Sequence, residues 1–396
     1  MTIPRQPLRV LISAGEASGE MYGAELIEQI RRVSPRPIEV FGLGGERMQR
    51  AGCDLIVQAH DVAVVGLFEV VRHLPGIYRH FHRLVAEAAQ RKPDVAVLID
   101  FPDWNLKLAK ELHRIGVPVV YYVSPQLWAW RRGRVKLIEQ FVRKMLVIFP
   151  FEREFYAEHG VDVDFVGHPL GRLEPPPITR EEMASRYALD PQKTWITLMP
   201  GSRRGEVARH LHTMMEAAAR LSRDPQQQFE FLLPVASTLR NSELGHKLEH
   251  GDGLLRDHGA TVRLVHDARE ALKHSRAAVV ASGTATVEAA VAGTPFVMVY
   301  RLSGLTYKLG RHLVKLPFYG MVNLIAGRQV IPELIQDAFT AENVEHALRQ
   351  LLPEGETRGQ MLAGLSEVKQ KLRGSTEELP AGLAARTVLN IAGASL

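Results

Sequence analysis

Short apolar runs recur along this chain, and stretches with a helical spacing of apolar and polar residues separate them. Branched side chains are frequent in the runs, and the apolar residues follow one another without alternation. Such runs are typical of strands buried on both faces of a parallel sheet, where helices cover each face. The predicted strands are Leu8–Ser13, Val95–Asp100, Val117–Val123, Met145–Phe149, Trp195–Met199, Phe229–Leu233, Val262–Val265, Ala277–Ala281 and Phe296–Tyr300.

Three consecutive prolines, at residues 175–177, divide these strands into two groups. Prolines cannot continue a helix or a central strand, so this stretch predicts a linker. We therefore expect an α/β protein with two Rossmann-like parallel-sheet domains, residues 1–172 and 173–354, and a length of 396 residues fits two cores. Ligands of such sheets bind outside the carboxyl ends of the strands, which predicts an active site in a cleft that the domains face.

Composition narrows the class of protein. Hydrophobic residues make up 46% of the chain and charged residues 23%, which is ordinary for a globular protein. A single cysteine, Cys53, excludes an intramolecular disulfide and favours a reducing compartment. The N-terminal apolar run is too short for a signal peptide, and no stretch reaches the ~20 apolar residues of a membrane span. We expect a cytoplasmic protein that is not integral to a membrane.

The most informative stretch is residues 277–300, which predicts a strand, a loop of small and hydroxyl residues, a helix, a turn and a second strand. A helix N-terminus presents unpaired N–H groups and a positive dipole end, and a small-residue loop lets a diphosphate approach it. Glu288, one turn further on, can reach a sugar hydroxyl. The alternative is an ordinary strand–helix connection whose small residues allow tight packing. The candidate loop residues are Ser282, Gly283, Thr284 and Thr286.

A second candidate loop, Gly201-Ser202-Arg203, follows the first strand of the second domain. Gly201 permits close backbone approach, and arginine donors suit phosphate oxygens. An arginine at a leaving diphosphate would stabilise the developing charge without a metal ion. The alternative is a solvated basic turn.

Acidic residues follow two strands of the first domain. Asp100 and Asp103 lie beside aromatic residues, and a partly desolvated aspartate can have a raised pKa and accept a proton as a general base. Asp100 is the better candidate, because Asp103 also suits the N-cap of the next helix. The loop from Ser13 to Glu20 enters a helix and contributes Glu16, although acidic residues in a first turn can simply complement the helix dipole.

Signals for a metal or another cofactor are weak, and we predict neither. The pairs His80/His82 and His210/His212 lack a third ligand nearby at helical spacing. Asp162-Val163-Asp164 has the D-x-D spelling of some metal-dependent sugar-nucleotide enzymes, but we do not expect it to bind metal. The chain has no P-loop, dinucleotide fingerprint or G-x-S-x-G elbow, which argues against P-loop ATP hydrolysis and a hydrolase triad.

A net charge of +5 favours an anionic partner, and in the absence of a nucleic-acid-binding motif we do not expect nucleic acid. Residues 62–84 mix apolar and basic side chains, which suits either a membrane interface or a core-packing helix with a solvated face. Pro75-Gly76 predicts a break of this segment into two pieces. The residues expected to face a membrane are Val64, Leu67, Phe68, Val71 and Leu74.

Six segments together resemble the lipid-A-disaccharide synthase family, whose members are inverting glycosyltransferases of the two-Rossmann-domain type called GT-B. The segments keep the family's order and cover most of the chain, and VSPQLWAWR, with Trp128 and Trp130, is the most specific. Glu20 and Val322 depart from the family's pattern, which has aspartate and proline there. The segments are SAGEASGE, DFPDWN, YYVSPQLWAWRRGRV, GHPL, MPGSRRGEV and ASGTATVE.

The resemblance implies a reaction and its site. UDP-2,3-diacylglucosamine would donate its sugar to 2,3-diacylglucosamine 1-phosphate, with Asp100 as the base, at the cytoplasmic surface of the inner membrane. Arg203 and the 282–286 loop would face the donor diphosphate, and Glu288 the ribose. Related folds also return their C-terminal helices, here about 355–396, to the first domain, and a homo-oligomer is compatible. The remaining implied residues are Asn323 on the donor side, and Ser13, Glu16, Ser18, Asp103 and Trp128 on the acceptor side.

Three other functions remain compatible with this sequence. Two are GT-B enzymes of a different specificity, a UDP-N-acetylglucosamine 2-epimerase and a peptidoglycan glycosyltransferase. The third is a two-domain ligand-binding protein without catalytic activity. Product analysis separates the enzymes, because an epimerase needs no lipid acceptor.

Overall fold

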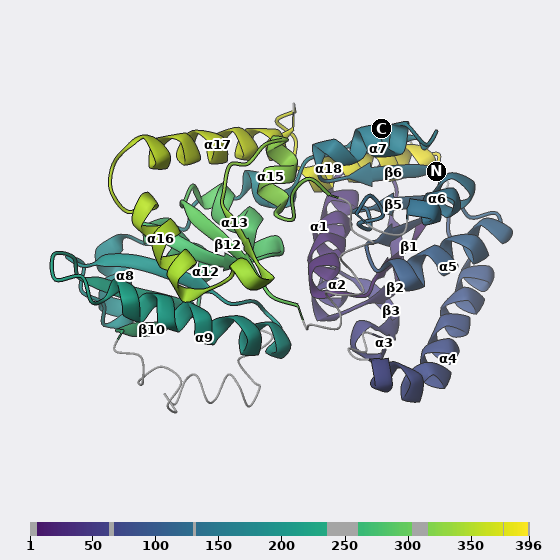
Figure 1. Cartoon of the computed structure of the whole chain (residues 1–396). Helices are drawn as coiled ribbons and strands as arrows, with labels where there is room; N and C mark the ends of the chain where they lie inside the picture. Colours follow the sequence, from purple (N-terminus) through teal and green to yellow (C-terminus); the bar gives the residue numbers. More distant parts are fainter. Residues whose placement is uncertain are drawn as a thin grey trace. The chain divides into compact units, whose positions relative to one another are not determined.

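The structure, a computed structural model, describes residues 6–62, 67–129, 132–235, 260–302, 316–374 and 376–394. Contacts divide the chain into two compact units, of which the first comprises Met1–Pro169 with Leu372–Leu396 and the second Leu170–Lys371. Each unit has a parallel sheet with helices on its faces (Figure 1). The predicted α/β class with two Rossmann-like sheets is confirmed.

The sheet of the first unit has seven strands in the order β3-β2-β1-β4-β5-β6-β7. The strand order reverses between β1 and β4, which pair in parallel with Ala14 opposite Ile99. In a sheet of this type the loops at such a reversal diverge to opposite faces and leave a crevice for ligands. The strands are β1 (Leu8–Ala14), β2 (Ile38–Gly44), β3 (Cys53–Gln58), β4 (Val95–Ile99), β5 (Val119–Tyr122), β6 (Lys144–Val147) and β7 (Val163–Phe165).

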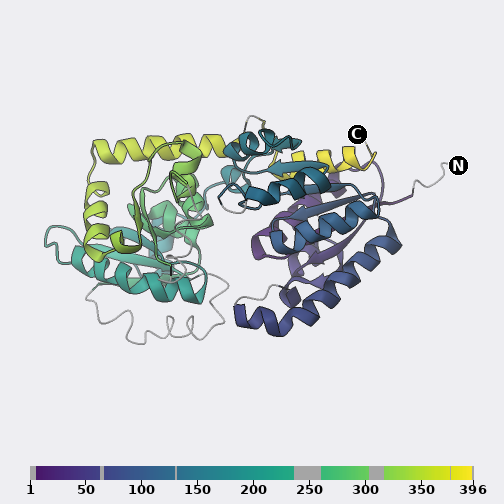
Figure 2. The ribbon, with the colours of Figure 1, turned by 45° about the vertical axis from the view of Figure 1, so that its right-hand side comes forward.

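Helices cover both faces of this sheet. The apolar side of one long helix, with Leu26, Ile27 and Ile30, is buried against one face, where the C-terminal helix also packs. Figures 1 and 2 show this last helix, in yellow, among the elements of the first unit. The helices are α1 (Ala17–Val33), α2 (Glu46–Arg50), α3 (Ala59–Val62), α4 (Leu67–Arg91), α5 (Pro102–Arg114), α6 (Val135–Phe141), α7 (Pro150–Ala157) and α18 (Pro380–Ile391), with a 3₁₀ turn at Arg132–Arg134. A second 3₁₀ turn, Pro169–Arg172, lies where the chain passes into the second unit.

The predicted break at Pro75-Gly76 is wrong, because α4 runs through Pro75 without interruption. A proline inside a helix removes one backbone hydrogen bond. The second half of α4 buries Leu84 and Ala88 in the core beneath the sheet, and this packing favours the continuous helix.

The sheet of the second unit has six strands in the order β10-β9-β8-β11-β12-β13, and its order reverses between β8 and β11. Its strands are β8 (Thr194–Met199), β9 (Phe229–Pro234), β10 (Val262–Val265), β11 (Ala277–Ala281), β12 (Phe296–Tyr300) and β13 (Glu333–Ile335). Its helices are α8 (Arg180–Tyr187), α9 (Arg204–Leu221), α12 (Ala268–His274), α13 (Thr284–Ala292), α15 (Met321–Ala326), α16 (Ala341–Leu351) and α17 (Glu356–Arg373), with a 3₁₀ turn at Gln336–Ala338.

The chain returns to the first unit later than the resemblance implies. All of residues 355–396 were expected in that unit, but α17 belongs to the second unit almost to its end. Lys371 Nζ donates to the carbonyls of Ile325 and Ala326 at 3.3 and 3.2 Å, which ties the end of α17 to α15. The chain then joins the first unit where the backbone N–H of His168 donates to Leu372 O at 2.7 Å.

None of the helices in the described part of the chain has both the length and the apolarity that crossing a bilayer requires.

Candidate functional site

Asp100 lies at the carboxyl end of β4, beside the point where the strand order of the first unit reverses. Its φ of 45° is in the left-handed region, as are the φ of 50° at Phe101 and of 64° at Val123, after β5. Residues other than glycine avoid this region, and a branched residue such as valine does so most strongly. Strained backbone of this kind persists where the surrounding structure enforces it, and it is frequent at functional sites.

Two side chains hold the Asp100 backbone in this conformation. The carbonyl of Asp100 accepts hydrogen bonds from Asn105 Nδ2 at 2.8 Å and from the Tyr121 hydroxyl at 2.6 Å. Asn105 is fully buried, and its Oδ1 accepts a hydrogen bond from Ser13 Oγ at 2.7 Å. Ser13, a predicted acceptor-side residue, is also fully buried. It therefore stabilises the Asp100 turn indirectly, through its hydrogen bond to Asn105.

The environment of Asp100 favours a protonated carboxyl group. Burial, and secondly the nearby charge of Glu16, raise the pKa of Asp100 to about 7. Glu16 is the exposed N-cap residue of α1, directly after β1. The two predicted acidic residues therefore meet at adjacent strand ends. A carboxylate with a pKa near neutrality is suited to accept a proton from a hydroxyl group.

Gly15 lets the Phe101 ring approach this turn. A Cβ atom built on Gly15 would lie 2.3 Å from Cδ1 of Phe101, which is far inside van der Waals contact. A residue without a side chain at position 15 is thus required by the aromatic ring beside Asp100. Glu20, further along α1, accepts a hydrogen bond from the backbone N–H of Arg47 at 2.6 Å and caps α2.

Three further residues, Ser18, Asp103 and Trp128, are predicted on the acceptor side. Ser18 is exposed in the first turn of α1. The N-cap residue of α5 is Phe101, and the Asp103 carboxylate in the first turn pairs with Arg134 at 2.7 Å. Trp128 is buried, and its Nε1 donates to Glu152 Oε1 at 3.0 Å, so the indole nitrogen points into the unit.

Glu152 is a buried carboxyl group that sequence reasoning missed. It also accepts a hydrogen bond from the backbone N–H of Phe149 at 3.1 Å, and burial raises its pKa to about 8. The group links the start of α7 to the loop that carries Trp128. Its position three residues into a helix that begins with Pro150 is a capping signature, which could have suggested the backbone contact but not the burial.

In the second unit, the loop after β8 adopts the geometry that the glycine predicted. Gly201 has a φ of 122°, and a Cβ there would lie 2.5 Å from Glu206 Oε2. The same Glu206 oxygen accepts hydrogen bonds from the backbone N–H groups of Ser202 at 3.1 Å and Arg203 at 3.4 Å, and the other oxygen pairs with Arg203 Nη1 at 3.3 Å. The side chain of Arg203 is 69% exposed. The Glu206 carboxylate therefore contacts the same N–H groups and guanidinium that are predicted to bind a diphosphate.

A buried histidine lies beneath this loop. His210 Nδ1 is 2.7 Å from Pro200 O, and the backbone N–H of Arg301 donates to His210 Nε2 at 3.0 Å. Burial lowers the pKa of His210. The imidazole connects α9 to the loop after β8 and to the residue that follows β12. It occupies the buried face of α9 with Val207, and a polar residue on an apolar helix face was the available sequence signal.

The small-residue loop after β11 leads into α13 as predicted. Gly283 has a φ of 144°, and a Cβ there would meet nothing within 4 Å. Ser282 and Thr284 flank it with partly or fully exposed side chains. Thr286 is buried, and its Oγ1 donates to Gly283 O at 2.7 Å, which stabilises the first turn. Open space around the helix start is compatible with an approaching anion.

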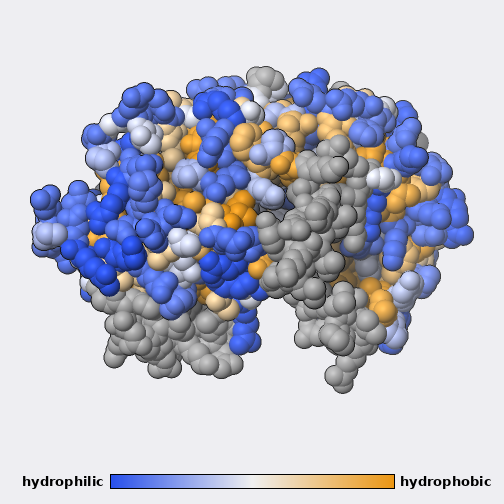
Figure 3. All heavy atoms as spheres, viewed as in Figure 1, coloured by the Kyte–Doolittle hydropathy of each residue, from blue (hydrophilic) through white to orange (hydrophobic). Residues whose placement is uncertain are grey.

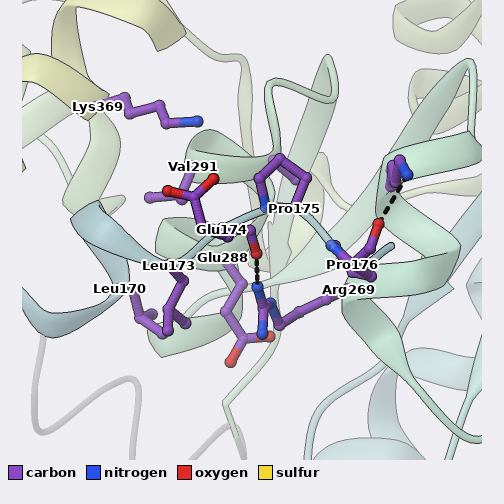
Figure 4. Close-up of a pocket in the computed structure, with 11 residues that line it drawn as sticks. Leu170, Leu173, Glu174, Pro175, Pro176, Arg269, Glu288, Val291 and Lys369 are labelled. Carbon is purple, nitrogen blue, oxygen red and sulfur yellow. Dashed lines mark hydrogen bonds between the residues drawn. The ribbon is translucent and has the colours of Figure 1, made fainter. Parts of the chain in front are cut away.

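Glu288 lines a small pocket of about 60 Å³ within the second unit (Figure 4). Its carboxylate lies near the guanidinium of Arg269, which also donates to the carbonyl of Glu174. Burial raises the pKa of Glu288, whereas Arg269 lowers it to a smaller extent. The other lining residues are Leu170, Leu173, Pro175, Pro176, Lys273, Val291, Ala292 and Lys369.

Asn323 is buried in the second unit, and both the oxygen and the nitrogen of its side-chain amide form hydrogen bonds there. Its Oδ1 accepts from the backbone N–H groups of Val330 at 2.7 Å and Ile331 at 3.0 Å. Its Nδ2 donates to Ile331 O at 2.9 Å and to Glu333 Oε1 at 2.8 Å. Asn323 thus organises the turn after α15, so any effect on a ligand passes through that turn.

Three of the side chains with a metal-like spacing contact charged side chains within the protein. Asp162 and Asp164 both form ion pairs with Lys144 Nζ, at 2.6 and 3.0 Å, and His212 Nε2 lies 3.3 Å from Glu216 Oε1. Across the described ranges, no three histidine, cysteine or acidic side chains gather as they would around a metal ion.

The residues predicted to face a membrane fall partly outside the described residues. Val64 lies outside them, and for Leu67, Phe68 and Val71 only the helical backbone in α4 is described. Leu74 is 38% exposed and Tyr78, one turn on, is 54% exposed. Figure 3 shows apolar residues, in orange, interspersed with hydrophilic ones on the visible face of each unit. The other exposed large apolar residues described are Leu137, Leu173, Tyr319, Leu362 and Leu379.

Comparisons with known proteins bear on the family. A sequence model described as lipid-A-disaccharide synthetase matches residues 10–387. The chain is 57% identical over 386 residues to the lipid-A-disaccharide synthase of Koribacter versatilis, a match that covers 97% of this chain and 99% of that protein.

Solved structures bear on the fold. The UDP-N-acetylglucosamine 2-epimerase of Neisseria meningitidis, bound to UDP-N-acetylglucosamine, superposes with a TM-score of 0.60 at 12% identity and covers 97% of this chain and 99% of its own. A calicheamicin glycosyltransferase superposes with a TM-score of 0.58 at 16% identity, covering 98% and 99%. At such low identity these likenesses concern the fold alone, and that fold is of the GT-B type.

Proposed function

The chain belongs to the lipid-A-disaccharide synthetase family, and on this premise we propose that it transfers the sugar of UDP-2,3-diacylglucosamine to 2,3-diacylglucosamine 1-phosphate. The products are a β-1,6-linked tetraacyl disaccharide 1-phosphate and UDP, in a step of lipid A synthesis. The main support within the structure is Asp100, which has a strained backbone at the strand reversal and a carboxyl group whose pKa is raised to about 7. Such a group can deprotonate a hydroxyl near neutral pH.

The chemical step is a single in-line displacement. The Asp100 carboxylate takes the proton of the acceptor 6-hydroxyl, and that oxygen bonds to the anomeric carbon of the donor. The bond from this carbon to the diphosphate oxygen breaks, and UDP leaves from the opposite face with inversion. Glu16 supports the role of Asp100 as a base, because its charge helps to raise the pKa of Asp100.

The donor is held by the second unit. Arg203 and the N–H groups of Ser202 and Gly283 would receive the diphosphate at the two helix N-termini, where negative charge is favoured. The exposure of Arg203 and the open space around Gly283 support this role. Glu206 must yield its contacts with the loop to the diphosphate. Glu288, on the wall of the pocket in Figure 4, would hold the ribose.

The acceptor binds to the first unit. Glu16 and the exposed Ser18 would contact its sugar, while Ser13 acts through Asn105 on the Asp100 turn. Asp103 and Trp128 would shape the site at the start of α5 and in the loop after β5. Their bonds to Arg134 and Glu152 support a positioning role for both.

The protein works peripherally at the cytoplasmic surface of the inner membrane, where both acylated substrates lie. The exposed pair Leu74 and Tyr78 on α4 supports this location, and Lys107 lies 5.9 Å from the Tyr78 ring. Apolar side chains beside basic ones suit an anionic lipid surface.

The test is incubation with the two acylated glucosamine substrates while UDP release is followed, with and without EDTA. We expect UDP only when both substrates are present, together with a β-1,6 disaccharide, and no effect of EDTA. Epimerisation of UDP-N-acetylglucosamine without a lipid acceptor would instead support the epimerase alternative. UDP release that EDTA abolishes would contradict the metal-free mechanism.

A further inference from the structure

We infer that His210 is a positioning residue that fixes the donor-binding loop after β8. The inference rests on the proposed function in one respect, namely that Gly201, Ser202 and Arg203 bind the diphosphate. His210 itself is fully buried and would not touch the donor.

The hydrogen bonds of His210 define one protonation state. The backbone N–H of Arg301 can only donate, so Nε2, at 3.0 Å, must be the accepting nitrogen. Pro200 O can only accept, so Nδ1, at 2.7 Å, must carry the proton. The neutral Nδ1–H form satisfies both partners, whereas an imidazolium could not accept from Arg301.

The hydrogen bond from His210 to the Pro200 carbonyl affects the loop because Pro200 is its first residue. Pro200 is followed by Gly201, whose φ of 122° is accessible to glycine and strained for other residues. The exposed Ser202 and Arg203 then lead into α9. The bond from His210 to the Pro200 carbonyl therefore fixes the residue from which the loop departs.

The second bond couples two strand ends. β8 and β12 flank β11, and the loop after β11 provides the other half of the proposed diphosphate site. His210 joins the residue after β8 to the residue after β12 through one rigid ring, which packs 5.6 Å from the ring centroid of Tyr300 and 5.8 Å from that of Phe339. One side chain thus sets the spacing between Pro200, after β8, and Arg301, after β12, on either side of β11.

Two substitutions separate the two bonds. In His210→Asn the amide nitrogen takes the position of Nδ1 and keeps the bond to Pro200, but the bond from Arg301 is lost. In His210→Gln the amide reaches the position of Nε2, so its oxygen can accept from Arg301 while Pro200 loses its donor. His210→Phe keeps the ring and removes both bonds.

Thr213→Val is the matched control. Thr213 is one turn further along α9, is 7% exposed, and its hydroxyl accepts from Arg301 Nη1 at 3.3 Å. The valine keeps the volume and removes a bond that does not reach the loop.

The experiment measures the dissociation constant of UDP by calorimetry, and the KM values of donor and acceptor, for the full chain and these variants. We expect His210→Phe and His210→Gln to weaken UDP binding about tenfold and raise the donor KM with little change in the acceptor KM. His210→Asn should restore UDP binding to within about threefold of the unmodified chain, and Thr213→Val should leave it unchanged.

Equal UDP affinity in the Asn and Gln variants would overturn the inference, as would equal changes in the donor and acceptor KM values. If His210→Phe does not fold, the Asn and Gln pair still decides. Absence of UDP binding by the unmodified chain would instead count against the proposed function, so the two failures are distinguishable.

Discussion

At the scale of single residues, the chemistry of Asp100 depends on its neighbours more than on the aspartate itself. Burial and the charge of Glu16 raise its pKa to about 7. A base must be deprotonated to act, so kcat/KM should increase with pH through about 7. Glu16→Gln removes the repulsion, lowers the pKa of Asp100, and should move this acidic limb to lower pH by up to about one unit.

A pH–rate profile of both forms measures the shift. Glu28→Gln is the control, because it removes the same charge from an exposed position further along α1. An acidic limb that stays at the same pH in Glu16→Gln would mean that Glu16 does not act on the base.

Glu206 gives a second prediction at this scale. Its carboxylate contacts the N–H groups and the arginine that the donor diphosphate would use. Glu206→Gln keeps an accepting oxygen but removes the competing charge, so UDP should bind about two- to fivefold more tightly, as expected for one exposed ion pair. Calorimetric titration with UDP measures this, with Glu216→Gln on the exposed side of α9 as control. Weaker binding would show that Glu206 supports the loop instead.

At the scale of elements, α4 is predicted to bind the lipid surface. Replacing Leu74 and Tyr78 together by serine removes exposed apolar area and should reduce sedimentation with anionic vesicles several-fold. Leu362→Ser is the control, because Leu362 is 36% exposed on α17 of the second unit. UDP release with water-soluble, short-chain substrates should be unaffected in both. Unaltered vesicle binding by the double variant would exclude this part of α4 from the membrane contact.

The loop after β5 depends on a buried acid in α7. Burial raises the pKa of Glu152 from its ordinary value of 4.5 to about 8, so folding takes up a proton between these values. Its contribution to stability is therefore complete below pH 4.5 and is lost as the pH rises through about 8.

Glu152→Gln keeps an acceptor for Trp128 and cannot titrate. Between about pH 5 and 9 the unmodified chain should lose at least about 1 kcal/mol of unfolding free energy relative to this variant, since one pKa unit is worth about 1.4 kcal/mol. Urea unfolding at several pH values measures the difference. Parallel pH dependence of the two proteins would contradict a protonated Glu152.

The sequence predicted most strands of both sheets, the edge strand β10 among them, but it missed β2, β3, β7 and β13. Central strands such as β4 and β11 are apolar on both faces, so their runs are unmistakable. The short β7 and β13 lie at sheet edges and have half-exposed residues, and β2 and β3 carry polar or glycine positions. Propensity also placed a break at Pro75, where the packing of α4 outweighs the lost hydrogen bond.

The same limit applies to the candidate site. Asp100, Gly201 and the loop at Gly283 could be found from the sequence, because strand ends and glycines have local signatures. The partners that make them effective could not be found. Asn105, Glu152 and His210 act through bonds to residues distant in sequence or through burial, and both depend on the folded chain.

At the scale of the whole molecule, the two units have the same sheet arrangement but carry different chemical groups at the strand reversal. In each sheet the candidate residues follow the two strands at which the order reverses, β1 and β4 in one, β8 and β11 in the other. The first unit presents acidic groups there, suited to removing a proton. The second presents an arginine at the start of α9 and open space around Gly283 at the start of α13, suited to receiving a diphosphate. We therefore assign proton removal to one unit and leaving-group stabilisation to the other.

The most direct test of this division is the paired measurement of kcat and of the UDP dissociation constant in Asp100→Asn and Arg203→Ala. Asp100→Asn should lower kcat by about 10²- to 10⁴-fold, the usual contribution of a general base, with UDP affinity unchanged. Arg203→Ala should weaken UDP binding and also lower kcat, because it removes charge stabilisation of the diphosphate. Normal turnover by Asp100→Asn, or loss of UDP binding in that variant, would contradict this division of roles.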